Sequence, residues 1–371
     1  MKLTLIVLLF ISLLPVFISV ICIPFWTRKT ESFGVTIPEE VYNHPNIKNL
    51  RKNYVLVSGS FAFIITLIFV YTSYIGDELT AGILFPLLIV MYIVGSMFIY
   101  IPFHQKMRDW KDNHPKWHAD PNVITINTRF RQQGITYSNK WFILPFIFTL
   151  ITIVMTLIAY PHIPNKIPIQ YNLTGEVTKW VDKSYRSALL FPILQFYLVL
   201  IFLFVNTVIR KAKQQIDANN PDESLQRNII FRRKWSRFII VTGTGFIFLL
   251  SLSQMNLFLS ISEQLLMGLI IAFTIFLLGW AIILSFTVGQ GGSRLKGKNI
   301  KTGQTSKNVM NRDDDKYWKL GIFYFNKNDP AIFLEKRFGV GWTNNWAHPV
   351  SWLIIIGILL LAFGIPFFLM K

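Results

Sequence analysis

Long apolar stretches alternate with shorter polar stretches along the whole chain. A helix that crosses about 30 Å of hydrocarbon needs about 20 apolar residues, because each residue advances the helix by about 1.5 Å. Inside the hydrocarbon every backbone polar group must be hydrogen-bonded within the segment, which favours helices. The pattern therefore predicts eight transmembrane helices, at residues 3–26, 54–75, 80–103, 141–161, 187–209, 235–257, 261–286 and 350–370.

Lysine and arginine residues are distributed unevenly between the two ends of these helices. Of the 37 basic residues, 31 lie in the loops that follow spans one, three, five and seven, when Arg237 at the inner edge of span six is included. The other six are Lys2, Lys371 and four residues of the loop between spans four and five. Because basic loops resist translocation, this asymmetry predicts both termini outside the cell and four basic loops in the cytoplasm. We therefore expect a multi-pass protein of the cytoplasmic (plasma) membrane.

The overall composition agrees with a membrane protein and excludes an ordinary soluble domain. Of 371 residues, 52% are hydrophobic and only 15% are charged, whereas roughly a quarter of residues are charged in soluble proteins. The net charge of +18 is spread over four loops beside membrane spans, so it favours contact with anionic lipid and not with nucleic acid. The one cysteine, Cys22, cannot form an internal disulfide.

The order of the loops suggests an internal duplication. Spans one to four are separated by a basic loop, a short acidic turn and a long basic loop, and spans five to eight show the same order. Both halves begin outside, which predicts two parallel four-helix repeats related by an axis along the membrane normal. The alternative is a chance similarity between short basic loops.

Two cytoplasmic segments have the alternating pattern of strands. Residues 123–130 alternate apolar and polar side chains, Gly134 with residues 135–137 provides a return, and residues 317–325 add a further candidate strand. The fold class is therefore an all-α integral membrane protein with a small cytoplasmic β-containing module. The predicted parts are a first four-span half (1–161), an extracytoplasmic Pro-rich loop (162–186), spans five to seven (187–288), a flexible basic linker (289–312), a cytoplasmic aromatic and basic module (313–349) and span eight (350–371).

Motifs for chemistry are scarce. No span carries an ionisable residue at its centre, which disfavours a proton-coupled pump. His114 and His118 are four residues apart, but Pro115 disfavours the helix that would place both on one metal. The sequence contains no G-x-S-x-G motif, no phosphate-binding loop and no second cysteine. We expect no catalytic residues, no metal and no cofactor, and therefore no enzyme.

The loop between spans four and five has the most distinctive sequence, Ile163-Pro-Asn-Lys-Ile-Pro-Ile-Gln-Tyr-Asn-Leu-Thr-Gly-Glu176, followed by Trp180 and Lys183. It resembles a bacterial domain of unknown function, numbered sixteen forty-eight, that occurs in relatives of the membrane immunity protein SdpI. That protein protects a Gram-positive cell from its own secreted toxin and takes part in signalling. Pro164, Pro168, Asn172, Gly175, Trp180 and Lys183 match the pattern of that domain, and for most of its members the resemblance implies no demonstrated activity. Our hypothesis for the loop is a receptor surface that binds an extracellular peptide or envelope molecule, with candidate residues Pro164, Pro168, Gln170, Asn172, Gly175, Trp180 and Lys183.

Gln170 departs from this pattern, because the family usually has histidine there. A role that depends on a titrating imidazole is therefore in doubt. The alternative to ligand binding is that the whole loop is only a rigid connector, in which prolines fix an extended backbone and residues 172–175 supply a turn.

A second resemblance lies near the C-terminus. Residues 323–330 and 336–343 resemble an uncharacterised domain numbered fifty-eight oh-eight, which often shares a chain with the first domain. Arg337, Phe338, Trp342 and Trp346 could place an aromatic and basic surface on the inner leaflet or on a cytoplasmic regulator. The alternative is a small folded module that packs its own aromatic side chains.

Together these features predict an SdpI-like, non-enzymatic membrane protein. It would sense an envelope-acting peptide or antibiotic, or give immunity or resistance to it, through the outer loop. The expected partners are the lipid bilayer, an extracellular peptide or envelope component, and a cytoplasmic regulator. The alternative is a transporter or lipid-handling protein built from two repeats.

Overall fold

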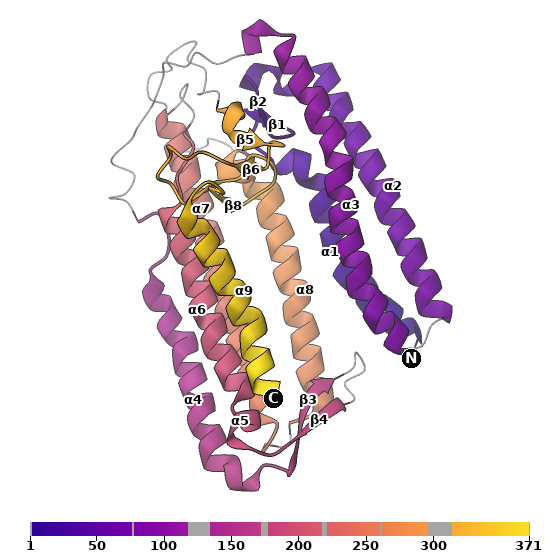
Figure 1. The fold of residues 1–371 in the computed structure, drawn as a ribbon, viewed down its shortest axis with the longest axis vertical. Helices are drawn as coiled ribbons and strands as arrows, with labels where there is room; N and C mark the ends of the chain where they lie inside the picture. Colours follow the sequence, from indigo (N-terminus) through magenta and orange to yellow (C-terminus); the bar gives the residue numbers. More distant parts are fainter. Residues whose placement is uncertain are drawn as a thin grey trace. The chain divides into compact units, whose positions relative to one another are not determined.

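The computed structural model describes residues 2–75, 78–117, 134–171, 177–216, 221–259, 261–295 and 314–370 (Figure 1). The side chains of residues 2–12, 78–82, 170–171 and 361–370 are not described. The chain forms two compact units. Unit 1 comprises Met1–Gln133, Ala212–Phe231 and Ile282–Ser351, and unit 2 comprises Gly134–Lys211, Arg232–Ala281 and Trp352–Lys371.

Six of the helices are long and apolar enough to cross a membrane, among the residues that the structure describes. The protein is therefore a mostly helical, multi-pass membrane protein, and the predicted helices are confirmed at this coarser level. The predicted number of eight is not confirmed. The six candidate spans are Pro45–Ile75, Ile83–Asp112, Asn139–His162, Leu190–Lys211, Pro221–Met255 and Glu263–Gly292.

The first and last helices differ from these six. Helix α1 (Lys2–Trp26) and helix α9 (Pro349–Met370) are both apolar. Their fully described apolar parts, Leu13–Trp26 and Pro349–Leu360, are shorter than a span.

Three helices form the main helical part of unit 1, among the described residues. They are α1, α2 (Pro45–Ile75) and α3 (Glu78–Asp112). Leu13 and Phe17 of α1 pack with Ile65 of α2 and Tyr92 of α3 in one buried cluster. The opposite faces of α2 and α3 carry exposed large apolar side chains such as Leu56, at 67% exposure. Lipid solvates such apolar faces well and water does not. The exposed faces of α2 and α3 therefore indicate contact with the bilayer.

Three short hairpins complete unit 1, together with the first turns of α7 (Pro221–Met255) and the end of α8 (Glu263–Val288). Each hairpin is an antiparallel pair. They are β1 (Glu31–Ser32) with β2 (Val35–Thr36), β5 (Trp318–Lys319) with β6 (Phe323–Tyr324), and β7 (Phe333–Glu335) with β8 (Trp342–Asn344).

These hairpins differ in detail from the predicted strands. The predicted strand at 317–325 is a tight hairpin, because Leu320 and Gly321 adopt positive φ angles of 52° and 66° and reverse the chain. Residues 135–137 form no strand. The predicted strand at 123–130 lies outside the described residues.

Unit 2 contains a helical bundle and one longer hairpin. Its helices are α4 (Ile143–Ala159), α5 (Tyr185–Ala188), α6 (Leu190–Lys211) and the remaining parts of α7, α8 and α9. Val199 of α6 packs with Ile240 and Ile247 of α7 in a buried cluster that also includes Phe142. The hairpin consists of β3 (Lys166–Tyr171) and β4 (Val177–Asp182) and joins α4 to α5.

Short 3-10 helices connect several of these elements. They are η1 (Glu39–Asn43), η2 (Pro115–Trp117), η4 (Asn139–Phe142), η5 (Tyr160–His162), η6 (Gln290–Gly292) and η7 (Asp315–Tyr317). The boundary between the two compact units does not fall between the two predicted four-helix repeats. Duplication therefore stays a prediction.

Candidate functional site

The β3–β4 hairpin contains most of the predicted ligand-binding residues. Ile167 pairs with Val181 and Pro168 pairs with Trp180. The register then shifts on either side of Gln170. The described residues 166–171 and 177–182 therefore form an extended antiparallel ribbon, in which the prolines suit the extended backbone.

Lys183 fixes the base of this hairpin. Its Nζ donates hydrogen bonds to the carbonyl oxygens of Pro161, at 3.2 Å, and Ile163, at 2.8 Å. The same ammonium group lies 5.0 Å from the centre of the Tyr160 ring. Ile163 and Ile167 are buried against Ala188. The hairpin thus stands on a packed, hydrogen-bonded base, and Lys183 has a structural partner set rather than a free charge.

Trp180 is the large exposed side chain among the described residues of the hairpin, with 52% of its surface accessible. Lys179 beside it and Pro164 at the base are exposed as well. The structure brings Trp180 next to Pro168 and leaves Gln170 at the register shift. Asn172 and Gly175 lie outside the described residues.

The four predicted residues near the C-terminus lie within unit 1. Arg337 is only 2% exposed, and Phe338 packs on Tyr100 with ring centres 4.5 Å apart. Trp342 contacts Phe231, and Trp346 meets Phe323 edge to face at 5.7 Å. This geometry favours a folded module over an exposed surface: Trp346 packs inside the module, whereas Phe338 and Trp342 pack against α3 and α7.

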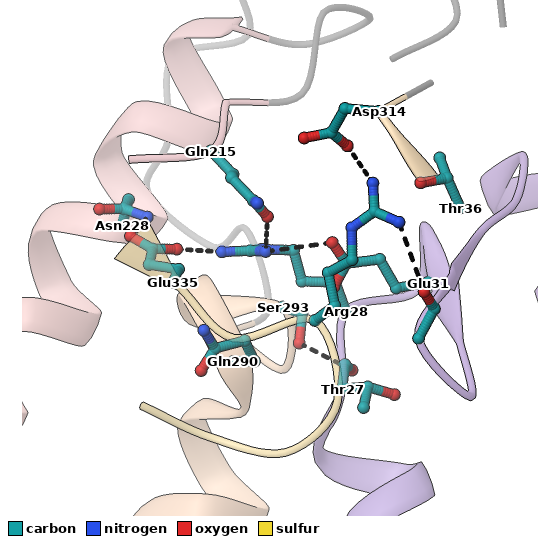
Figure 2. Close-up of polar contacts among 12 residues, drawn as sticks. Thr27, Arg28, Glu31, Thr36, Gln215, Asn228, Gln290, Ser293, Asp314 and Glu335 are labelled. Carbon is teal, nitrogen blue, oxygen red and sulfur yellow. Dashed lines mark hydrogen bonds and ion pairs between the residues drawn. The ribbon is translucent and has the colours of Figure 1, made fainter. Parts of the chain in front are cut away.

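A buried network of charged side chains also lies in unit 1 and was not predicted from the sequence (Figure 2). The guanidinium group of Arg28, just after α1, contacts Glu335 of β7 and Gln215. Its Nη1 also lies 3.4 Å from Oε1 of Glu31 in β1. Glu335 is fully buried and accepts a hydrogen bond of 2.8 Å from Asn228 of α7.

Arg337 is the second cation of this network. It forms ion pairs with Asp314 and Asp315 and donates a hydrogen bond of 3.3 Å to the carbonyl oxygen of Gly34. Lys111 of α3 pairs with Asp315 at 2.6 Å. Burial alone would raise the pKa of Asp315, but the charges of Arg337 and Lys111 outweigh it and lower that pKa to about 2. The carboxylate of Asp315 is therefore ionised over the whole physiological range.

The loop after α8 packs against the same network. The side chain of Gln290 accepts a hydrogen bond of 2.7 Å from the backbone N–H of Gly341 and donates one of 2.9 Å to its carbonyl oxygen. A side chain at Gly292 would collide with the backbone of Arg227. Residues 289–295 are therefore folded, so the prediction of a flexible linker over 289–312 is wrong for this part, and residues 296–312 lie outside the described residues.

A row of buried polar side chains follows α4, α6 and α7 in unit 2. Gln254 donates hydrogen bonds to the hydroxyl of Thr156, at 3.1 Å, and to the carbonyl oxygen of Ala188, at 2.9 Å. Gln195 of α6 is fully buried, and neither polar atom of its amide has a partner among the described residues. The row consists of Thr149, Thr152, Thr156, Gln195, Ser251 and Gln254. Such hydrogen bonds join helices where no water is present.

Comparison with protein families identifies two segments of the chain. Residues 147–196 match the family described as Domain of unknown function (DUF1648), and residues 327–352 match the Family of unknown function (DUF5808). The two resemblances seen in the sequence are thus confirmed. No curated protein and no solved structure matches the chain. The first segment covers most of α4, the whole β3–β4 hairpin and the start of α6, and the second covers β7 and β8.

Sequence reasoning missed Glu31, Glu335 and Asp315, because their partners are far away along the chain. Arg28 and Glu335 are separated by 307 positions, and Lys111 and Asp315 by 204. One local signal existed. Acidic residues are scarce, with only 19 in 371. An acidic side chain in a loop rich in lysine and arginine is therefore expected to pair with one of those basic side chains.

Proposed function

We propose that this protein is a non-enzymatic, SdpI-like membrane protein that senses or resists an envelope-acting peptide or antibiotic through its β3–β4 hairpin. The single observation that carries the proposal is an anchored hairpin that exposes Trp180. The DUF1648 match includes this hairpin from end to end. A rigid base with an exposed aromatic side chain supports binding, because little conformational entropy is lost when a ligand docks.

The hairpin also indicates the chemistry of a ligand. Lys166, Lys179 and Arg186 are exposed on or beside it, whereas Asp182 is its exposed acid among the described residues. In a two-stranded sheet each strand has one edge free for a further strand. An extended, amphipathic peptide with acidic groups would fit, since it could pair with a strand edge, cover Trp180 and neutralise the lysines.

The proposal requires the hairpin to face the cell exterior. The excess of lysine and arginine in the other loops favours this orientation. We further propose that α1 and α9 cross the plasma membrane of a Gram-positive bacterium as the first and eighth spans, so that both termini are extracytoplasmic.

A rescue experiment tests the proposed function. The gene is deleted, the cells are challenged with a panel of envelope-active peptides and antibiotics, and wild-type or variant genes are returned. Trp180→Ala removes the proposed contact, which we expect to cost about 2 kcal/mol, or a roughly 30-fold weaker Kd. Trp141→Ala is the matched control, because Trp141 is 58% exposed but lies at η4, away from the hairpin residues in sequence.

The proposal expects the Trp141 variant to restore resistance and the Trp180 variant to fail at equal expression. Equal rescue by both variants would contradict it.

The buried polar row supports a second candidate function, the transport or handling of a polar or amphipathic molecule. An unpaired amide such as that of Gln195 is costly inside a membrane and often marks a functional path. In the same rescue experiment, transport predicts that Gln195→Leu abolishes function while Trp180→Ala does not. The hairpin proposal predicts the opposite pair of results.

A further inference from the structure

Glu31 is the weakly paired acid in the buried network of unit 1. Arg28 makes its close contacts with Glu335 and Gln215, and its distance to Oε1 of Glu31 is 3.4 Å (Figure 2). Arg337 is engaged by Asp314 and Asp315. Both neighbouring cations thus have other carboxylates as closer partners.

The second carboxyl oxygen of Glu31 lacks any partner among the described residues. Only 5% of the Glu31 surface is exposed, and Oε2 is fully buried. An ionised carboxylate in such a position loses its hydration without recovering it through hydrogen bonds, which is costly. A neutral carboxylic acid is far less costly there.

We propose that Glu31 is a proton-binding site whose charge controls how firmly Arg28 and Arg337 hold the C-terminal module in place. When Glu31 is neutral, Arg28 interacts undisturbed with Glu335, and Arg337 with Asp314 and Asp315. When Glu31 loses its proton, it competes for both cations and repels the neighbouring carboxylates. The module, which includes β5 to β8, is then held less firmly against the segment that contains β1 and β2.

The electrostatic surroundings agree with titration near neutral pH. Burial raises the pKa of Glu31 to about 7; the charges of Arg28 and Arg337 oppose the rise, and those of Asp314 and Glu335 add to it. Lys111 on α3 faces Asp315 instead of Glu31. Since the ordinary pKa is 4.5, the folded protein keeps a proton that the unfolded chain has already lost between these two values. Stability therefore falls as the pH rises from the lower value through the higher one.

The experiment uses the full chain reconstituted in lipid nanodiscs and compares two acid-to-amide variants. Glu31→Gln removes the proposed proton site. Glu39→Gln is the matched control, because Glu39 also lies between α1 and α2. Its side chain pairs with Lys29 and is 43% exposed. Difference infrared spectroscopy between about pH 6 and about pH 8 reads the carbonyl stretch of a protonated carboxylic acid. Hydrogen exchange of residues 314–348 reads how firmly the module is held.

We expect the wild type and Glu39→Gln to lose one carboxylic-acid band over this range, and their residues 314–348 to be less protected from exchange at the higher pH, after correction for the intrinsic rise of exchange with pH. Glu31→Gln should lack the band and keep the same corrected protection at both pH values. If Glu31→Gln keeps the band, or if the wild type shows none, the proposal is wrong. If Glu31→Gln does not fold, Glu31→Asp replaces it, because this variant retains a carboxylic acid. A shifted carboxylic-acid band then supports its assignment to residue 31, and an unchanged band contradicts that assignment.

Discussion

At the scale of single residues, Gly34 and Gly321 show how closely two turns of unit 1 approach each other. A Cβ atom at Gly34 would lie 2.6 Å from the Cα of Gly321 and 2.7 Å from the hydroxyl of Tyr100. That hydroxyl donates a hydrogen bond of 2.9 Å to the carbonyl oxygen of Phe33 and lies 3.0 Å from that of Leu320. The two glycines therefore let the turn of β1–β2 and the turn of β5–β6 share one hydrogen-bonding side chain.

Gly34→Ala tests this close approach. Gly34 has a φ of 76°, so alanine adds both backbone strain and a collision with backbone atoms. We expect a loss of about 2–4 kcal/mol, seen as a lower melting temperature of the detergent-solubilised protein. Gly339→Ala is the control, because Gly339 has a φ of 94° but an added Cβ would meet no atom within 4 Å.

The control variant should lose only about 1 kcal/mol, from strain alone. Equal losses in the two variants would show that strain, and not the contact between the turns, explains Gly34.

The contacts of single side chains were also the feature that the sequence predicted least well. The residues Pro168 and Trp180 could be grouped because both lie in one short loop, and they do pair. The placement of Arg337 could not be predicted, because its environment is built from Gly34, Asp314 and Asp315, which come from separate parts of the sequence. Basic and aromatic residues occur both in modules that bury them and in modules that expose them. Their presence in the sequence therefore did not decide between the two.

At the scale of elements, apolar length predicted the positions of the helices but not their ends. Helix α2 begins at Pro45 and α7 at Pro221, well before the predicted starts at 54 and 235. The added turns contain charged residues such as Arg51 and Arg227, which a search for apolar runs excludes. The added turns of α7 contain Asn228, which donates a hydrogen bond to Glu335 in the network of unit 1. The unpredicted start of this helix therefore contributes to the geometry of that network.

Close packing between helices of unit 2 depends on small residues of α7. A Cβ at Gly245 would collide with the ring of Phe273 on α8, and one at Gly243 would lie 2.8 Å from the ring of Phe202 on α6. Glycine at these positions lets neighbouring helices approach. By contrast, a Cβ at Gly59 of α2 would meet no atom within 4 Å.

Gly245→Ala should therefore destabilise the bundle by about 1–2 kcal/mol, because the Phe273 ring must move from its place. Adding Phe273→Leu should recover part of the loss, since the smaller side chain leaves room for the new methyl group. Thermal unfolding of both single variants and the double variant measures this coupling. Gly268→Ala on α8 is the control and should be neutral or slightly stabilising, because no atom lies within 4 Å of the added group.

Additive effects in the double variant would exclude the proposed contact between Gly245 and Phe273.

At the scale of the whole molecule, the sequence predicted a multi-pass membrane protein and the presence of both family domains, and these are confirmed. Hydrophobic length and local motifs suffice for such statements because they depend on short stretches of chain. The orientation in the membrane and the function depend on what surrounds the protein, and they stay proposals. Both rest on the hairpin that contains Trp180 being exposed to the exterior.

Cysteine labelling in intact cells tests that claim most directly. Single cysteines are placed at Lys179 in β4 and at Lys327 near β6, two exposed positions, with Cys22→Ser as the background. A membrane-impermeant maleimide is added to intact protoplasts. We predict that Lys179→Cys is labelled at once and that Lys327→Cys is labelled only after the membrane is permeabilised. Labelling of Lys327→Cys but not Lys179→Cys in intact protoplasts would contradict the orientation and, with it, the receptor role of the hairpin.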